Sequence, residues 1–157
     1  MIFSNTTPFI ALCAIGRLEL LPALFKRIHV VEHVVRECPA GGDIKVPPLG
    51  SLSWVSVISV TASDPEPMLT QLDEDEKWTL HAARLANAQL LLIDERIGRN
   101  LAERMGLKVI GTLGILLKAR QQGLITSFSN AALEMRAQGI FYHPSLIARL
   151  AESIGES

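Results

Sequence analysis

The stretch LLLIDERIGRNLAERMGLKVIGTLG, residues 90–114, contains a strand, a helix and a second strand, followed by the start of another helix. Residues 90–93 are wholly apolar, which is typical of a strand covered on both faces of a parallel sheet. The amphipathic segment 95–105 predicts a helix, the apolar segment 108–110 predicts the next strand, and a further helix is expected over 112–121. Because parallel strands need crossover helices of this kind, the unit predicts an α/β fold.

The same alternation continues on both sides of this unit. Further strands are expected at 2–4, 28–31 and 54–60, the last at a sheet edge, and further helices from about residue 5, at 18–25, around 34–37, and at 73–87, 131–138 and 144–154. We therefore predict one α/β domain over 1–157, with a mostly parallel central sheet, helices on both faces in a three-layer fold, and C-terminal helices within 127–154 packed on it.

Prolines and threonines predict where two of these helices begin or end. Pro8 is expected as the first residue of the first helix, because that position needs no N–H donor. Thr6 or Thr7 is expected as its N-cap. Pro39 is expected to end the short helix around 34–37.

The composition suits a domain with a large aliphatic core. Of 157 residues, 48% are hydrophobic and 5% aromatic, so few rings are available to stack on bases. The formal net charge of −1 argues against a protein that holds nucleic acid by neutralising many phosphates. Two cysteines are too few for a tetrahedral zinc site. The sequence has no basic export start and no apolar run of roughly 18 residues, so we expect a soluble, cytoplasmic protein without membrane contact.

Candidate site residues follow the predicted strands, since ligands of open parallel sheets bind beyond the carboxyl ends of the strands. This rule selects Asn5, Asp94 and Thr112. Asp94 is either a ligand at the rim of a buried strand or the N-cap of the helix that begins at Glu95. Asn5 could bind a metal through its carbonyl oxygen, or form an Asx turn that starts the first helix.

Two glutamates on predicted helices are further candidates. Glu76 falls on the core-facing side of its helix near Leu80, which favours an inward carboxylate that needs a partner. The alternative is a capping box, in which Glu76 bonds back to the Asp73 N–H. Glu37 lies on the apolar side of its helix, three residues after Val34, although a solvated glutamate near a helix end is common.

Arginines on the helix after Asp94 are candidate phosphate contacts. Arg96, Arg99 and Arg104 lie within about three turns of that residue. The alternative is an ordinary solvated helix face.

Four segments of the chain, in this order, resemble those of the PIN domain. SNTTPFIAL at 4–12 is similar to the family's opening, which normally reads SDTSPLI. VVRE at 34–37 is similar to the second segment, which ends in an acid, and LDEDE at 72–76 is similar to the third, which usually reads LDxGE. The most specific match is LIDER at 92–96 together with VIGTLG at 109–114. The resemblance covers nearly the whole chain. It is closest to the uncharacterised prokaryotic PIN-like proteins of the DUF3368 type, many of them nucleic-acid-binding or toxin-like.

This resemblance implies a metal-dependent nuclease that hydrolyses RNA. The implied metal ligands are Asp94, Glu76, Glu37, Asn5 and Glu95, of which Asp94, Glu76 and Glu37 are the catalytic acids. The implied substrate contacts are Thr6, Arg96, Arg99 and Thr112. Mg²⁺ or Mn²⁺ is the expected cofactor, because hard cations prefer oxygen ligands and can activate a bound water.

Asn5 departs from the family pattern, in which the first acid is an aspartate. The change removes one negative charge from the site, so metal affinity should fall and the nuclease should be weakened or inactive. Three interpretations remain open. The chain is a ribonuclease, with an antitoxin protein as partner if it is a toxin; or an inactive module that binds RNA or protein through the same groove; or an α/β domain whose acids are caps and surface charges. The resemblance also allows a homodimer.

Overall fold

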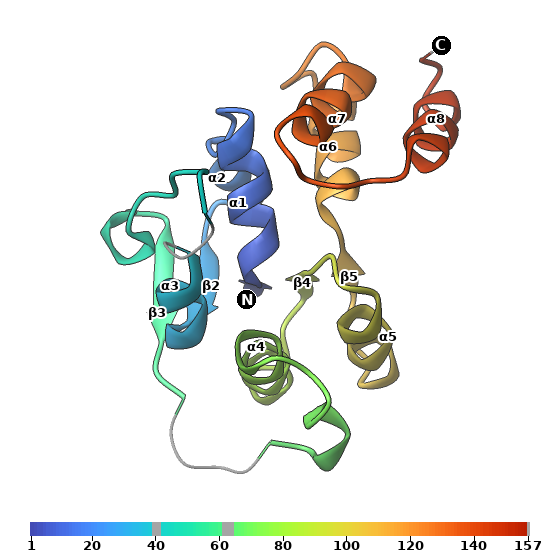
Figure 1. The fold of residues 1–157 in the computed structure, drawn as a ribbon. Coiled ribbons are helices and arrows are strands. Elements are labelled where there is room, and N and C mark those ends of the chain that lie inside the picture. Colours follow the sequence, from blue (N-terminus) through green and yellow to red (C-terminus); the bar gives the residue numbers. More distant parts are fainter. Residues whose placement is uncertain (39–41, 61–64, 157) are drawn as a thin grey trace.

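The computed structural model describes residues 1–38, 42–60 and 65–156, and the sheet lies at the centre of this part of the chain (Figure 1). Its strands are β1 (Ile2–Ser4), β2 (Ile28–Val31), β3 (Val55–Ile58), β4 (Leu90–Leu92) and β5 (Val109–Ile110). They pair in the order β3-β2-β1-β4-β5, and every pair is parallel. The α/β prediction and the edge position of β3 are therefore confirmed.

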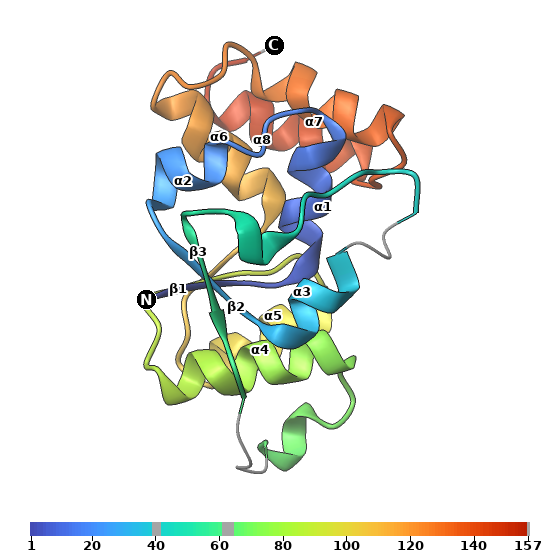
Figure 2. The ribbon, with the colours of Figure 1, turned by 90° about the vertical axis from the view of Figure 1, so that its left-hand side faces the viewer.

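Helices cover both faces of the sheet. Those in the described residues are α1 (Thr6–Ala14), α2 (Leu20–Phe25), α3 (Glu32–Glu37), α4 (Glu74–Leu85), α5 (Arg96–Arg104), α6 (Thr112–Gln121), α7 (Phe128–Ala137) and α8 (Pro144–Ser153). Figure 2 shows α4 and α5 below the strands, and α1, α2 and α6 above them with α7 and α8. None of these helices has the length and apolarity that crossing a bilayer requires.

The central strands form where the sequence is most apolar. Leu91, Leu92 and Ile93 have no exposed surface, because β4 lies between β1 and β5 and between the two helix layers. The buried apolar run predicted at 90–93 is thus confirmed, although the strand itself ends at Leu92. Such a strand needs neighbours on every side, which is why it stands near the middle of the sheet.

The start of α1 differs in detail from its prediction. Asn5, rather than Thr6 or Thr7, is the N-cap, and Pro8 is the third helical residue. Proline is tolerated there because the first helical N–H groups have no intrahelical acceptor. Pro39 lies outside the described residues.

The buried side of α4 was predicted only in part. The apolar spacing of residues 73–87 predicts Leu80 and Leu85 on the core side of this helix, with His81 on the opposite, solvated side. His81 is nevertheless buried, because the segment around Glu66 folds against that side and places Glu66 Oε2 3.3 Å from His81 Nδ1. Leu85 was expected on the core side, yet 63% of it is exposed near the end of the helix. Helical periodicity predicts which side of a helix is apolar, but it cannot show that a segment distant in sequence covers the other side.

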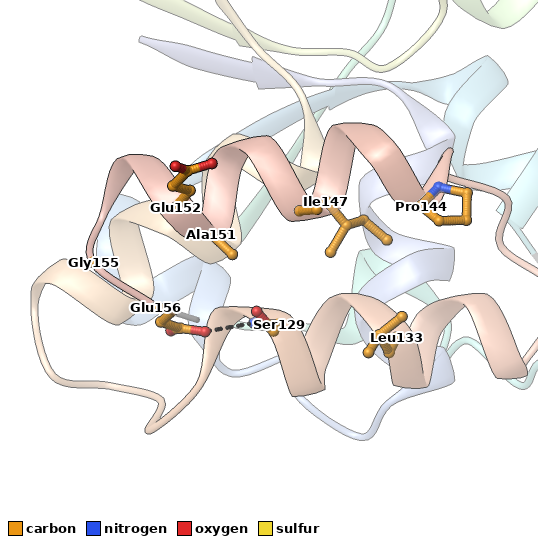
Figure 3. A pocket seen from close by; sticks show the side chains of 9 residues that line it. Ser129, Leu133, Pro144, Ile147, Ala151, Glu152, Gly155 and Glu156 are labelled. Atoms are coloured by element: carbon orange, nitrogen blue, oxygen red, sulfur yellow. Dashed lines mark hydrogen bonds between the residues drawn. The ribbon is translucent and has the colours of Figure 1, made fainter.

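The C-terminal helices pack as a hairpin against α6. Gly139 lies between α7 and α8 with φ of +93°, a conformation that glycine adopts without strain. Leu133 of α7 and Ile147 of α8 face a cleft of about 660 Å³ between the two helices (Figure 3). The Glu156 carboxylate returns to the start of α7 and accepts hydrogen bonds from the Phe128 and Ser129 N–H groups, at 2.7 and 3.0 Å.

Candidate active site

The candidate site lies where β1 and β4 end side by side. Ser4 pairs with Leu92 in the parallel register, and the Asn5 N–H donates to the Leu92 carbonyl at 2.9 Å. Both strands end on the same side of the sheet, where β1 continues into α1 and β4 continues into α5. Residue 5 and residues 94–95 therefore meet although about 90 positions separate them in the sequence.

Asn5 is the buried polar group at the centre of this junction. Only 1% of it is exposed, and its side chain makes no hydrogen bond to cap α1. Its Nδ2 donates to Glu95 Oε2 at 3.4 Å, whereas its Oδ1 has no hydrogen-bond partner among the described residues. A buried carbonyl oxygen without a donor is unfavourable by about 1–3 kcal/mol, so this position favours a ligand that accepts its lone pairs.

Glu95 faces Asn5 from the start of α5. It is the N-cap residue of α5, but its side chain does not cap the helix. Its Oε1 accepts from Thr7 Oγ1 at 2.8 Å, and its Oε2 accepts from Asn5. The first turn of α1 therefore holds the Glu95 carboxylate in place.

Glu76 brings a second carboxylate to the same region from α4. It is 8% exposed, and no hydrogen bond to it is found in the described residues, so the capping box with Asp73 is not formed. Burial raises the pKa of Glu76 to about 7, and the negative charges of Glu95 and two nearby aspartates add to the shift. Glu76 and Glu95 line one cleft of about 500 Å³ together with Arg96 and Ile97. A cation in this cleft would favour the ionised carboxylates.

Asp94 points away from this cleft. Its Oδ1 accepts from the Thr112 N–H at 2.6 Å, and its Oδ2 accepts from Thr112 Oγ1 at 2.7 Å and from the Tyr142 hydroxyl at 3.0 Å. The expected N-cap role for α5 is therefore wrong, since Asp94 binds the first residue of α6 instead. Asp94 lines a separate cavity of about 380 Å³ beside Arg99 and Tyr142.

Comparison with known proteins identifies the family. The sequence matches the PIN domain family DUF3368 over residues 1–156. The chain belongs to this family. A PilT N-terminus domain protein from the hyperthermophilic archaeon Sulfolobus solfataricus is similar in structure, with a TM-score of 0.59 and 17% sequence identity over 76% of this chain and 93% of that chain. At this identity the likeness shows the fold alone. No curated protein matches the chain.

Membership confirms the PIN resemblance carried by the four sequence segments. PIN domains are typically metal-dependent nucleases, and the α/β architecture with its wholly parallel sheet is PIN-like. The site residues that the resemblance implied can now be placed in this PIN domain one by one.

Glu37 is an expected ligand that makes no contact with the other expected ligands among the hydrogen bonds and ion pairs of the described residues. It is the last residue of α3, its side chain is exposed, and it makes no hydrogen bond or ion pair with Asn5, Glu76 or Asp94 among the described residues. Its position on the apolar side of α3 was inferred from Val34, which is buried, but Glu37 itself is exposed at the last residue of the helix.

The expected substrate contacts divide into buried and accessible residues. Thr112 has no exposed surface, so it orients Asp94 and does not contact RNA. Thr6 is mostly buried and donates to Asp75 Oδ2 at 3.1 Å. Arg96 is exposed and lines the cleft with Glu76 and Glu95, and Arg99 lines the cavity beside Asp94.

Sequence reasoning missed Thr7, Asp75 and Tyr142 as members of this PIN-domain site. Thr7 and Asp75 are adjacent to residues that were considered, and their partners become visible only when β1, α4 and β4 are assembled. Tyr142 is the single tyrosine of the chain, which is the one signal that could have singled it out. Its partner Asp94 precedes it by 48 residues.

The donor chemistry of the cleft fits a hard divalent cation. In the described ranges no three His, Cys, Asp or Glu side chains are grouped to hold a metal ion. The oxygen atoms that the structure does bring to this junction are the Asn5 amide oxygen and the Glu95 carboxylate. The amide oxygen is buried and unpartnered, the same side chain contacts Glu95, and Glu95 shares its cleft with Glu76. Carboxylate and amide oxygens are ligands that Mg²⁺ and Mn²⁺ prefer.

Proposed function

We propose that this PIN domain is an endoribonuclease dependent on Mg²⁺ or Mn²⁺, with its active site where the cleft lined by Glu76 and Glu95 adjoins the buried Asn5 side chain. The observation that carries the proposal is the buried, unpartnered Asn5 Oδ1 beside Glu95 at the carboxyl ends of two neighbouring strands. Family membership supports it, because PIN domains are typically metal-dependent nucleases. Such a protein would be a toxin where an antitoxin protein is its partner.

The residues of the cleft divide the chemical work among them. Asn5, Glu76 and Glu95 would hold the metal, which when bound would make a water nucleophilic at neutral pH. Thr7 and Asn5 keep the Glu95 carboxylate in place by donating to its two oxygens. Arg96, on the wall of the same cleft, would contact a phosphate of the RNA.

Asp94 and Glu37 take supporting roles in this proposal. Asp94 has both oxygens engaged by Thr112 and Tyr142, so we assign it to orienting the β4–α5 junction. Glu37 is exposed at the end of α3, and we do not include it among the proposed metal ligands.

Asn5 favours a second candidate function, an inactive module that binds RNA in the same cleft. An amide carries no charge, so the site has one negative charge fewer than an aspartate would provide and holds a divalent ion less tightly. In that case RNA binds without cleavage, even at high Mn²⁺ concentration.

RNA cleavage tests both functions directly. A labelled single-stranded RNA is incubated with the protein and Mn²⁺, with and without EDTA, and compared with Glu76→Gln and Glu95→Gln. We expect EDTA and either substitution to abolish cleavage. Glu103→Gln is the matched control, because Glu103 is an exposed glutamate on the same helix as the cleft arginine. Cleavage that survives EDTA and both site substitutions would exclude the proposed nuclease.

Asn5→Asp separates the two functions. If the parent binds RNA without cutting it and Asn5→Asp gains Mn²⁺-dependent cleavage, the parent is the inactive module. If the parent cleaves and loses activity with Glu76→Gln, it is the nuclease.

A further inference from the structure

Tyr142 joins the C-terminal hairpin to the edge of the candidate site. It lies between α7 and α8, and its hydroxyl donates to Asp94 Oδ2 at 3.0 Å. Its two neighbours along the chain do not share this position, since Phe141 is 81% exposed and His143 begins α8 as its N-cap. The loop thus turns one aromatic side chain inward and leaves the adjacent one in solvent.

The Asp94 carboxylate is held by a complete set of donors. Thr112 supplies its backbone N–H to one oxygen and its hydroxyl to the other, and Tyr142 adds a second donor to Oδ2. Gly111 makes this approach possible, because a Cβ there would lie 2.8 Å from Asp94 Oδ1. Three donors from two distant segments therefore define one orientation of this carboxylate.

The Tyr142 hydroxyl acts as a donor throughout the physiological pH range. Burial, and then the negative charge of Asp94, raise the pKa of the phenol far above its usual range. The phenol therefore keeps its proton, and the hydroxyl remains the donor in this bond.

The orientation of Asp94 bears directly on its neighbour Glu95. The two side chains leave consecutive residues in different directions, Asp94 toward α6 and Tyr142, and Glu95 toward Asn5 and Thr7. Asp94 and Glu95 share a peptide unit, so a change in the backbone conformation at Asp94 also moves the atoms from which the Glu95 side chain projects. A rotation of this backbone would carry the Glu95 carboxylate away from the unpartnered Asn5 Oδ1.

We propose that Tyr142 is a positioning residue: its hydroxyl holds Asp94 and, through Asp94, sets the orientation of Glu95 in the cleft, so that the α7–α8 hairpin controls the geometry of the site. The inference deepens the proposed function and rests on it where metal binding and cleavage are concerned. Residues that orient ligands from behind change metal affinity or activity by about 10-fold to 100-fold when they are removed. Tyr142 is one of three donors to Asp94, so its effect falls at the lower end of that range.

Tyr142→Phe tests the inference, because it removes the hydroxyl and keeps the ring. We expect Mn²⁺ affinity, measured by titration calorimetry, to fall about ten-fold. In RNA cleavage we expect kcat to fall while KM stays within about two-fold, since Tyr142 acts through Asp94 and Glu95 and not on RNA. Phe141→Leu, in the same loop, is the control and should match the parent.

A double-mutant cycle with Asp94→Ala shows whether Tyr142 acts through Asp94. In the Asp94→Ala background, Tyr142→Phe should change Mn²⁺ affinity by less than about two-fold, because the shared partner is gone. A ten-fold loss that persists in that background would overturn the inference, as would parent-like affinity in Tyr142→Phe alone. If Asp94→Ala does not fold, Thr112→Val, which removes the other hydroxyl donor, replaces it: the two donor losses should then be non-additive.

Amide hydrogen exchange separates this inference from the proposed function. In Tyr142→Phe the amides of Glu95 and Thr112 should exchange faster than in the parent, whereas in Phe141→Leu they should not. If the parent neither binds Mn²⁺ nor cleaves RNA, the proposed function is wrong. Faster exchange in Tyr142→Phe would still show that the Tyr142 hydroxyl holds Asp94 and the backbone of Glu95 in place. Unchanged exchange of the Glu95 amide in Tyr142→Phe would overturn the positioning role of Tyr142.

Discussion

Glu156→Gln should loosen the C-terminal hairpin, and the structure predicts by how much. The Glu156 carboxylate accepts hydrogen bonds from the Ser129 and Phe128 N–H groups and from the Ser127 hydroxyl, and it pairs with Arg120 at 3.2 Å (Figure 3 shows the bond to Ser129). A carboxylate at the free N–H groups of a helix start combines hydrogen bonding with a favourable helix dipole.

The magnitude follows from the pKa of Glu156. Hydrogen bonds, first from the Ser129 N–H and then from Phe128, lower the pKa from 4.5 to about 2. At about 1.4 kcal/mol per unit, this corresponds to at most about 3.5 kcal/mol of stability. Arg120 is 41% exposed and solvent screens its contribution. Glutamine also keeps one acceptor oxygen, so we expect a loss of about 1–2 kcal/mol at pH 7, or about 2–8 °C in Tm.

The pH dependence has a definite sign. Because the folded-state pKa of Glu156 is depressed, its stabilisation is fully present above about pH 4.5 and is lost as the pH falls toward 2. Urea denaturation followed by circular dichroism should therefore show a gap in unfolding free energy between parent and Glu156→Gln at pH 7 that narrows to a small fraction of its size by about pH 2.5. Glu152→Gln, at an exposed glutamate of α8, is the control and should stay within about 0.5 kcal/mol of the parent. A gap that is absent at pH 7, or that persists unchanged at pH 2.5, would refute this reasoning.

Three shorter predictions concern the candidate site. Asn5→Asp should raise Mn²⁺ affinity about ten-fold or more in titration calorimetry, because it restores a negative charge; equal affinities would contradict the role given to Asn5. Glu76 has a raised folded-state pKa of about 7, so its contribution to stability should decline by up to about 3 kcal/mol as the pH rises from about 4.5 through 7. In urea denaturation Glu76→Gln should lack this decline. The same dependence of unfolding free energy on pH in both proteins would show that the carboxylate is not buried as described. Gly111→Ala should displace the Asp94 carboxylate, since the new Cβ would lie 2.8 Å from Oδ1, with a loss of about 1–3 kcal/mol in unfolding free energy; unchanged stability would mean that Asp94 is not held at this position.

Periodicity predicted the elements well because it is a local property of the chain. Strands β1 and β2 and helix α6 occupy residues 2–4, 28–31 and 112–121 as expected, and the other strands and α-helices differ from their predictions by a few residues at the ends. Those differences arise where ends depend on distant partners. Asn5, for example, is the N-cap residue of α1, but its side chain binds Glu95 at the start of α5 instead of capping α1.

The candidate site was predicted less completely than the fold. Sequence reasoning selected Asn5, Glu76 and Glu95, which the structure places around one junction. It also selected Glu37, which is exposed, and Thr112, which is buried under Asp94. Helical angle places a residue on a side of its own helix, but the neighbouring elements determine whether that side is enclosed.

The sequence by itself determined the alternation of strands and helices and the family, because apolar periodicity and short motifs are readable one segment at a time. Only the tertiary structure decided which of two consecutive acids faces the cleft. Asp94 and Glu95 leave the same strand end, and donors from Thr112 and Tyr142 turn the first one way while Asn5 and Thr7 hold the second the other way. Those donors come from three separate places in the chain, so their combined effect exists only once the sheet and the C-terminal hairpin have assembled.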